Sequence, residues 1–263
     1  MLKHLFIAKQ YVKYYLHAKN AHGIHSPFVF DFIENVIQDN RHYYTFDDIE
    51  LLRNEIYHNN QFIEVEDFGA GSHLQKTRQR KISQIAKIAG RSEKFGKLLF
   101  RIVIHSKANQ ILELGTSLGL GTSYLASARQ EAQIHTIEGS KTIAAEAKIN
   151  FNRLQLQNIT QHIGNFDEIL LDVLEKSSKF DLIFIDGNHQ EQATLRYFQQ
   201  CLPFISENSI IIFDDIHWSQ GMLRAWEKIK SHDSVRLSID LFYMGVVFFE
   251  PAFKEKQHFV LKY

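Results

Sequence analysis

Two short acidic sequences, Asp186-Gly-Asn-His189 and Asp214-Asp215-Ile-His217, hold the residues best suited to chemistry. Each follows an apolar run, LIFI or IIIF, that predicts a buried strand. Ligands of open α/β sheets bind at the carboxyl ends of strands, so we expect both sequences to face one site. Carboxylate oxygens suit a hard divalent cation such as Mg²⁺ or Ca²⁺, and an imidazole titrates near neutrality. The sequence therefore indicates cation binding or general-base chemistry at this edge of a sheet.

A second candidate site is the sequence Gly115-Thr-Ser-Leu-Gly119-Leu-Gly121, which follows the apolar run ILEL and opens a helical pattern. Glycine lets the backbone approach a ligand because no Cβ obstructs it. The strand-like sequence IHTIE ends in Glu138, 23 residues after Gly115, close to the spacing of an acid that binds a ribose diol. The loop lacks the order G-x-G-x-x-G, which disfavours a nicotinamide cofactor.

The elements that must position these residues follow from periodicity. From Gln110 onward, short strand-like runs alternate with helical stretches, which predicts a mostly parallel sheet covered on both faces. The last two runs, RLSIDLFY and GVVFFE, meet at a tight turn at Met244-Gly245 and predict an antiparallel hairpin. We predict an α/β fold: a doubly wound, mostly parallel seven-stranded sheet over residues 108–263, with an N-terminal helical cap over residues 1–107.

From Asn109 to Glu250 the chain resembles the class I S-adenosylmethionine-dependent methyltransferases. ILELGTSLGLGTSYLA is similar to their first motif and IHTIE to their second. The resemblance implies that Glu138 holds the ribose of the cofactor and that Asp186 lies near the methyl group. It implies further cofactor contacts from the first motif and from the end of the third strand: Glu113, Gly115, Ser117, Gly119, Asn165 and Phe166.

The acidic sequences are similar to those of the metal-dependent catechol and caffeoyl-CoA O-methyltransferases. In that family one acid ends strand four, and an Asp-Asn or Asp-Asp pair ends strand five. Asp186, Asp214 and Asp215 match those metal ligands, and His189 stands where the family has a catalytic lysine. The resemblance implies O-methylation of a small-molecule hydroxyl with S-adenosylmethionine and Mg²⁺ or Ca²⁺. The catalytic residues would be His189, Asp186 and His217.

Two alternatives remain open at this point. One is metal-independent methylation of an amine or a carboxylate, with His189 or His217 as the base. The other is a non-catalytic module that binds S-adenosylmethionine. Methylation of nucleic-acid bases is disfavoured, because strand four ends in IDGNH and not in the Asn-Pro-Pro-aromatic signature of base methyltransferases.

Composition limits the partners. Lys+Arg and Asp+Glu are 30 each, so no global field attracts nucleic acid or an anionic membrane. The chain has one cysteine, Cys201, and no apolar run near the ~18 residues of a membrane span, so we expect a cytoplasmic protein. The expected partner is a small-molecule acceptor, and the basic run described below suits an anionic one. We expect no nucleic acid and no membrane, and allow for a homodimer.

The first hundred residues resemble the variable cap over the substrate of such enzymes. A basic run from Lys76 to Lys97 is suited to an anionic substrate, and we predict that the loop from Asp67 to Arg80 is a mobile lid. The sequence Glu66-Asp-Phe-Gly69-Ala-Gly71 imitates a second glycine loop, but no helix and acid-ended strand follow it, so we predict a plain loop. The first helix carries lysines opposite an apolar face, which favours packing on its own domain or on a dimer mate.

Overall fold

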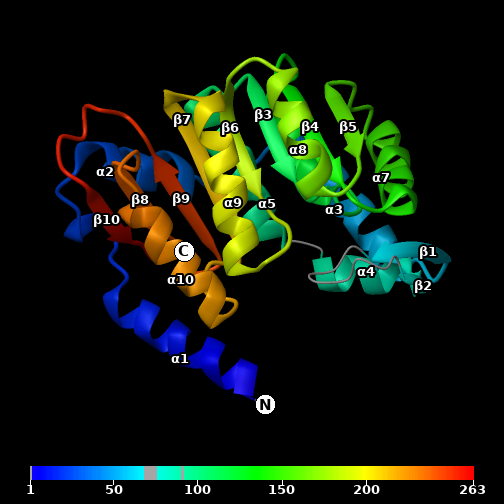
Figure 1. Ribbon diagram of the computed structural model, residues 1–263, viewed down its shortest axis with the longest axis horizontal. Coiled ribbons are helices and arrows are strands. Elements are labelled where there is room, and N and C mark those ends of the chain that lie inside the picture. Colours follow the sequence, from blue (N-terminus) through cyan, green and yellow to red (C-terminus); the bar gives the residue numbers. More distant parts are fainter. Residues whose placement is uncertain (1, 68–75, 90–91) are drawn as a thin grey trace. The chain divides into compact units, whose positions relative to one another are not determined.

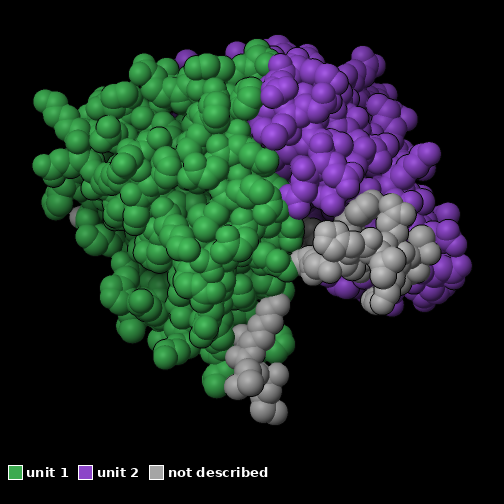
Figure 2. Space-filling view, viewed as in Figure 1, with its two compact units in different colours: residues 1–37, 177–263 green, residues 38–176 purple. Residues whose placement is uncertain are grey.

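A computed structural model describes residues 2–67, 76–89 and 92–263 (Figure 1). The chain forms two compact units, which Figure 2 colours separately. Unit 1 combines Met1–Ile37 with Ser177–Tyr263, and unit 2 is Gln38–Lys176. We predict a division of the chain at residue 107. The boundaries of the two compact units lie elsewhere, and the division at residue 107 stays a prediction. No helix in the described part of the chain is long and apolar enough to cross a membrane.

Unit 2 contains three parallel strands, each followed by a helix. The strands are β3 (Gln110–Leu114), β4 (Gln133–Glu138) and β5 (Ile159–Ile163), in that order in the sheet. The helices are α6 (Leu120–Ala128), α7 (Lys141–Arg153) and α8 (Phe166–Glu175). Ile111, Leu112 and Leu114 are buried because a parallel strand is covered on both faces. The predicted strand and helix alternation is confirmed here.

A tyrosine and a glycine set the packing of two helices in unit 2. Tyr124 of α6 is fully buried and stands where the dinucleotide fingerprint would place its third glycine. Its ring lies on Gly96 of α5 (Glu93–Ser106), where a Cβ would come within 2.3 Å of the ring. The glycine that allows α5 and α6 to pack closely therefore lies on α5, and α6 has a tyrosine at the contact.

The remaining elements of unit 2 are two helices and a hairpin. The helices are α3 (Tyr44–His58) and α4 (Ile82–Ala89), and the hairpin pairs β1 (Phe62–Asp67) antiparallel with β2 (Lys76–Lys81). The predicted loop from Asp67 to Arg80 is wrong at both ends, because Asp67 is the last residue of β1 and residues 76–80 belong to β2. The basic sequence TRQRK has no apolar alternation of its own, so its pairing with β1 decides its structure. Residues 68–75, including Gly69 and Gly71, lie outside the described residues, and the predictions for them stay untested.

Unit 1 contains five sheet strands in the order β10-β8-β9-β7-β6. Their bounds are β6 (Phe180–Ile185), β7 (Ile205–Asp214), β8 (Leu237–Asp240), β9 (Met244–Phe248) and β10 (Gln257–Val260). β6 and β7 are parallel, and the predicted antiparallel hairpin is β8 with β9. β10 runs parallel to β8, so the described strands other than the β1–β2 hairpin number eight where we predict seven.

The helices of unit 1 come from both segments of the chain. They are α1 (Leu2–His17), α2 (Pro27–Phe32), α9 (Glu191–Cys201) and α10 (Gln220–Ser231), with short helical turns at Ala21–Gly23, Ile33–Ile37 and Leu202–Phe204. α2 packs on the last strands through aromatic rings: Phe28 and Phe32 each contact Phe248 edge to face, at ring-centre distances of 5.1 and 5.9 Å. N-terminal helices therefore complete the unit that holds the acidic sequences.

Candidate functional site

The glycine loop of unit 2 is a tight turn between β3 and α6. Gly115, Ser117 and Gly119 have φ angles of 110°, 47° and 82°, in the region that favours glycine. A Cβ on Gly119 would come within 2.4 Å of the Phe151 ring, so both its conformation and its surroundings require glycine. The Gly115 N–H donates to the Ile137 carbonyl at 2.9 Å, which ties the loop to β4.

Glu138, at the end of β4, holds this loop in place. Its Oε2 accepts a hydrogen bond from the Ser117 N–H, and its Oε1 accepts one from the Ser140 N–H, both at 2.9 Å. Ser140 is the N-cap of α7, so one carboxylate joins the glycine loop to the start of the next helix. A carboxylate oxygen can accept more than one hydrogen bond, so these backbone contacts do not preclude hydroxyl donors of a ligand.

Glu113 lies beneath the loop and is 1% exposed. Its Oε2 accepts hydrogen bonds from the hydroxyls of Thr122 and Thr136, at 2.5 and 2.6 Å. Burying a carboxylate is costly unless hydrogen bonds compensate for the lost water, and these hydroxyls supply that compensation. The sequence analysis missed both threonines. The predicted contact of Glu113 with the cofactor stays a prediction.

Asn165 and Phe166 lie at the start of α8. The Asn165 side chain caps this helix by accepting a hydrogen bond from the Asp167 N–H at 3.1 Å, and Phe166 is half-buried. Glu138 and Asn165 thus end neighbouring parallel strands, as the resemblance to methyltransferases requires. Their predicted contacts with ribose and adenine stay predictions.

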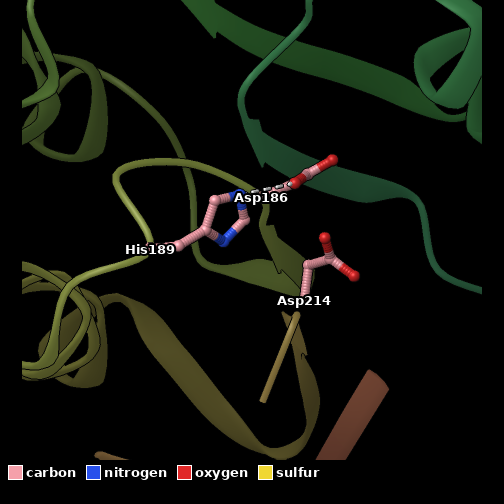
Figure 3. A group of neighbouring side chains, drawn as sticks. All are labelled: Asp186, His189 and Asp214. Atoms are coloured by element: carbon pink, nitrogen blue, oxygen red, sulfur yellow. Dashed lines mark ion pairs between the residues drawn. The ribbon is translucent and has the colours of Figure 1, made fainter. Parts of the chain in front are cut away.

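Unit 1 brings three of the predicted residues together (Figure 3). Asp186 follows β6, Asp214 is the last residue of β7, and His189 comes from the loop before α9. One ligand atom from each lies within 4.8 Å of the other two. Nε2 of His189 is 3.6 Å from the Asp186 carboxylate. Two carboxylates and one imidazole at these separations fit a divalent cation.

Asp215 differs from the predicted arrangement. We predict it as a ligand beside Asp186 and Asp214, but the three-residue group of the structure has His189 in its place. The Asp215 carboxylate lies 4.0 Å from Nε2 of His189, and the φ of Asp215 is 53°. Asn188, with a φ of 52°, turns the loop so that His189 faces Asp186. A positive φ at Asn188 was not evident from the sequence.

His217 has a different partner. Its Nε2 is 2.8 Å from Oδ2 of Asp240, and its ring stacks on Phe242 with centres 5.1 Å apart. The other oxygen of Asp240 accepts the Phe242 N–H at 2.8 Å, so Asp240 fixes the imidazole and the chain beyond β8 together. Nδ1 of His217 is buried and has no hydrogen-bond partner among the described residues. The sequence analysis did not identify Asp240.

Comparison with known proteins shows that residues 112–216 match a family model described as a methyltransferase domain. The chain is 32% identical over 124 residues to a catechol O-methyltransferase of Niastella koreensis, which covers 46% of this chain and 55% of that protein. It is 29% identical over 86 residues to an uncharacterized protein of Acanthamoeba polyphaga mimivirus, with 31% and 38% coverage. The chain therefore spans about half the length, or less, of these curated relatives.

Solved structures share the fold at lower identity. An O-methyltransferase from Bacillus cereus in complex with S-adenosylhomocysteine has a TM-score of 0.57 at 21% identity, over 84% of this chain and 97% of that one. An S-adenosylhomocysteine-bound methyltransferase from Podospora anserina has a TM-score of 0.59 at 13% identity, over 86% and 97%. The predicted α/β fold is confirmed by this likeness. Residues 112–216 thus match a family model described as a methyltransferase domain, and part of the chain is similar to a catechol O-methyltransferase.

Proposed function

We propose that the chain transfers a methyl group from S-adenosylmethionine to a hydroxyl of a small molecule, with the help of Mg²⁺ or Ca²⁺. The observation that carries this proposal is the grouping of Asp186, His189 and Asp214 at the ends of β6 and β7. These residues would hold the cation, with Asp215 as a further candidate ligand. Two of its members, Asp186 and Asp214, are acidic residues through which the chain resembles the metal-dependent O-methyltransferases.

The proposal assigns a separate role to each group of residues. When bound, the cofactor supplies an electrophilic methyl group, and the cation favours the deprotonated form of the acceptor hydroxyl. The loop from Gly115 to Gly119 and the carboxylate of Glu138 bind and orient the cofactor. Asp186 and Asp214 position the hydroxyl of the acceptor molecule. In the metal-independent alternative, Nε2 of His189 takes the proton of the acceptor, and His217, oriented by Asp240, is the second candidate base.

Titration calorimetry with S-adenosylhomocysteine tests the cofactor assignment. Glu138→Ala removes two hydrogen bonds from ribose hydroxyls to a charged group, each about 1.5–3 kcal/mol, so we expect affinity to fall at least about tenfold. The same change frees the N–H groups of Ser117 and Ser140, so the melting temperature is measured in parallel. Glu146→Ala on α7 is the control and should bind as the wild type does. Unchanged affinity in the Glu138 variant, or tighter binding of NAD, would exclude the assignment.

Thermal melting of the chelator-treated protein tests the cation. We expect Mg²⁺ or Ca²⁺ to raise the melting temperature, because a bound cation relieves repulsion between Asp186 and Asp214. Asp214→Asn should abolish that shift and methyl transfer to a catechol together, while the affinity for S-adenosylhomocysteine is kept. The exposed Asp48→Asn on α3 is the matched control. If neither ion shifts the melting temperature nor restores activity after chelation, the metal-independent alternative takes the place of this proposal.

A further inference from the structure

The outer face of α1 is apolar and exposed. Leu5, Val12 and Leu16 are 69%, 58% and 75% exposed, and the neighbouring Tyr15 is 56% exposed. With the exposed Ala8, they repeat at intervals of three and four residues, so they form one stripe along the helix. A run of large apolar side chains in water is costly, and such a stripe marks an interaction surface.

The opposite face of α1 is fixed to unit 1. The hydroxyl of the buried Tyr14 donates a hydrogen bond to the Leu261 carbonyl at 2.5 Å and accepts one from the Tyr263 N–H at 3.2 Å. The ring of Tyr11 meets Phe242 edge to face with centres 5.0 Å apart. α1 is therefore held with its apolar stripe turned away from the residues that anchor it, and in Figure 1 its first turns extend clear of the strands of unit 1.

Only positive charges accompany the stripe. The first 30 residues contain four lysines and no Asp or Glu. Lys9, Lys13 and Lys19 are exposed, and the exposed Lys262 places its ammonium 5.0 Å from the centre of the Tyr15 ring. No carboxylate of the described residues forms an ion pair with Lys9, Lys13, Lys19 or Lys262. The surface is thus apolar with a basic border.

A second copy of α1 complements this surface poorly. In a two-fold antiparallel pair of helices, each flank meets the same flank of the other copy. Lys9 and Lys13 lie on one flank of the stripe, so the pair would bring four lysines together with no acid to balance them. An anionic surface balances the same charges.

We propose that α1 docks in the plane of a bilayer surface that contains anionic phospholipids, with Leu5, Val12 and Leu16 in the outer acyl region. Lysines beside an apolar helical face, and tyrosines at its edge, are the composition of helices that lie in such surfaces. From the sequence alone we expect no membrane partner; the exposure of the stripe in the structure is the reason for the change. The proposal is independent of the methyl acceptor.

Flotation of the full chain with vesicles tests the proposal. We expect the protein to float with vesicles of equal parts phosphatidylcholine and phosphatidylglycerol and to stay behind with phosphatidylcholine alone. Raising NaCl from about 0.1 M to about 0.5 M should reduce the floated fraction, because salt screens the lysines. Lys9→Glu with Lys13→Glu should lower the partition coefficient at least about tenfold. Leu5→Gln, Val12→Gln and Leu16→Gln together should abolish flotation.

Control variants carry the same changes on unit 2. Lys141→Glu with Lys148→Glu on α7 matches the charge reversal, and Leu51→Gln with Leu171→Gln matches the loss of exposed apolar side chains, since those are 65% and 45% exposed. Both should float like the wild type, and all variants should keep its melting temperature. The proposal is overturned by equal flotation with both vesicles, by no flotation, or by α1 variants that float normally. It is also overturned if the wild type is a dimer that the triple variant dissociates and no vesicle binds it.

Discussion

At the scale of single residues, two acids beside the glycine loop, Glu113 and Glu138, have distinct surroundings. Glu113 is sealed beneath the glycine loop by the hydroxyls of Thr122 and Thr136, whereas Glu138 binds the backbone of that loop and is half-buried. Glu113 therefore stabilises the turn from below. Glu138 combines a structural hydrogen bond with access to a ligand. Substitution of Glu113 should act on folding, and substitution of Glu138 on binding.

A pair of histidines in unit 2 predicts a pH dependence of stability. Nδ1 of His135 on β4 is 3.1 Å from Nε2 of His162 on β5, and the rings are stacked. Burial lowers the pKa of both imidazoles below 6.5, and their mutual repulsion lowers that of His162 further. The unfolded chain therefore binds more protons, so stability is fully present above about pH 6.5 and is lost as the pH falls below it.

Urea unfolding at a series of pH values measures this loss. His135→Asn with His162→Asn should flatten the fall in the free energy of unfolding below about pH 6.5. His258, whose pKa burial also lowers, keeps part of the dependence in the variant. The exposed His58→Asn is the control and should follow the wild-type curve. A double variant with the wild-type pH dependence would show that the pair does not titrate as argued.

At the scale of elements, the contact between α5 and α6 predicts a costly substitution. Gly96→Ala places a Cβ 2.3 Å from the Tyr124 ring, and that ring cannot easily move, because its hydroxyl donates to Glu50 at 2.5 Å. Alanine favours a helix over glycine by about 1 kcal/mol, but overpacking a core costs about 1–3 kcal/mol. We expect net destabilisation, measured as a lower urea midpoint. In Gly23→Ala, where the nearest atom to the Cβ is 3.7 Å away, the midpoint should hardly change. An unchanged urea midpoint for Gly96→Ala would mean that α5 and α6 can move apart with no loss of free energy of unfolding.

The elements show how far local pattern determines structure. The apolar runs that become β3, β6 and β7 are evident in the sequence because burial on both faces demands them. β10 was missed because it has only four residues, two polar followed by two apolar, with no alternation to indicate a strand, and its pairing with β8 decides its structure. The residues at strand ends were predicted, but the entry of His189 into the acidic group depends on the left-handed backbone at Asn188. The partner of His217, Asp240, comes from another strand, so spacing in the chain does not indicate it.

At the scale of the whole molecule, Tyr14 joins distant parts of the chain. Burial raises the pKa of its phenol to about 12, because the ionised phenolate would lose the water that surrounds it in the unfolded chain. The unfolded phenol ionises near pH 10, so stability is fully present below that pH and is lost as the pH rises towards about 12. Tyr14→Phe removes both hydrogen bonds and should cost about 1–3 kcal/mol at neutral pH.

Urea unfolding of Tyr14→Phe also tests the predicted loss of stability at alkaline pH. Tyr14→Phe should lose stability less steeply than the wild type above about pH 10, since its side chain has no proton to release. Tyr44→Phe, at a side chain that is 86% exposed, is the control and should leave both the neutral stability and the alkaline slope unchanged. An identical alkaline slope in the Tyr14 variant would assign the loss to other groups.

The discontinuity of unit 1 has a consequence for biosynthesis. Residues 1–37 leave the ribosome early, but their packing partners, residues 177–263, follow only after all of unit 2 has been translated. Domains generally fold as units during synthesis, so unit 2 has a complete set of internal contacts before unit 1 does. Until then Tyr14 of α1 and the ring of Phe32 lack their partners, Leu261 and Phe248, from the end of the chain. We therefore expect the nascent chain to present its amino-terminal helices to chaperones for longer than any other segment.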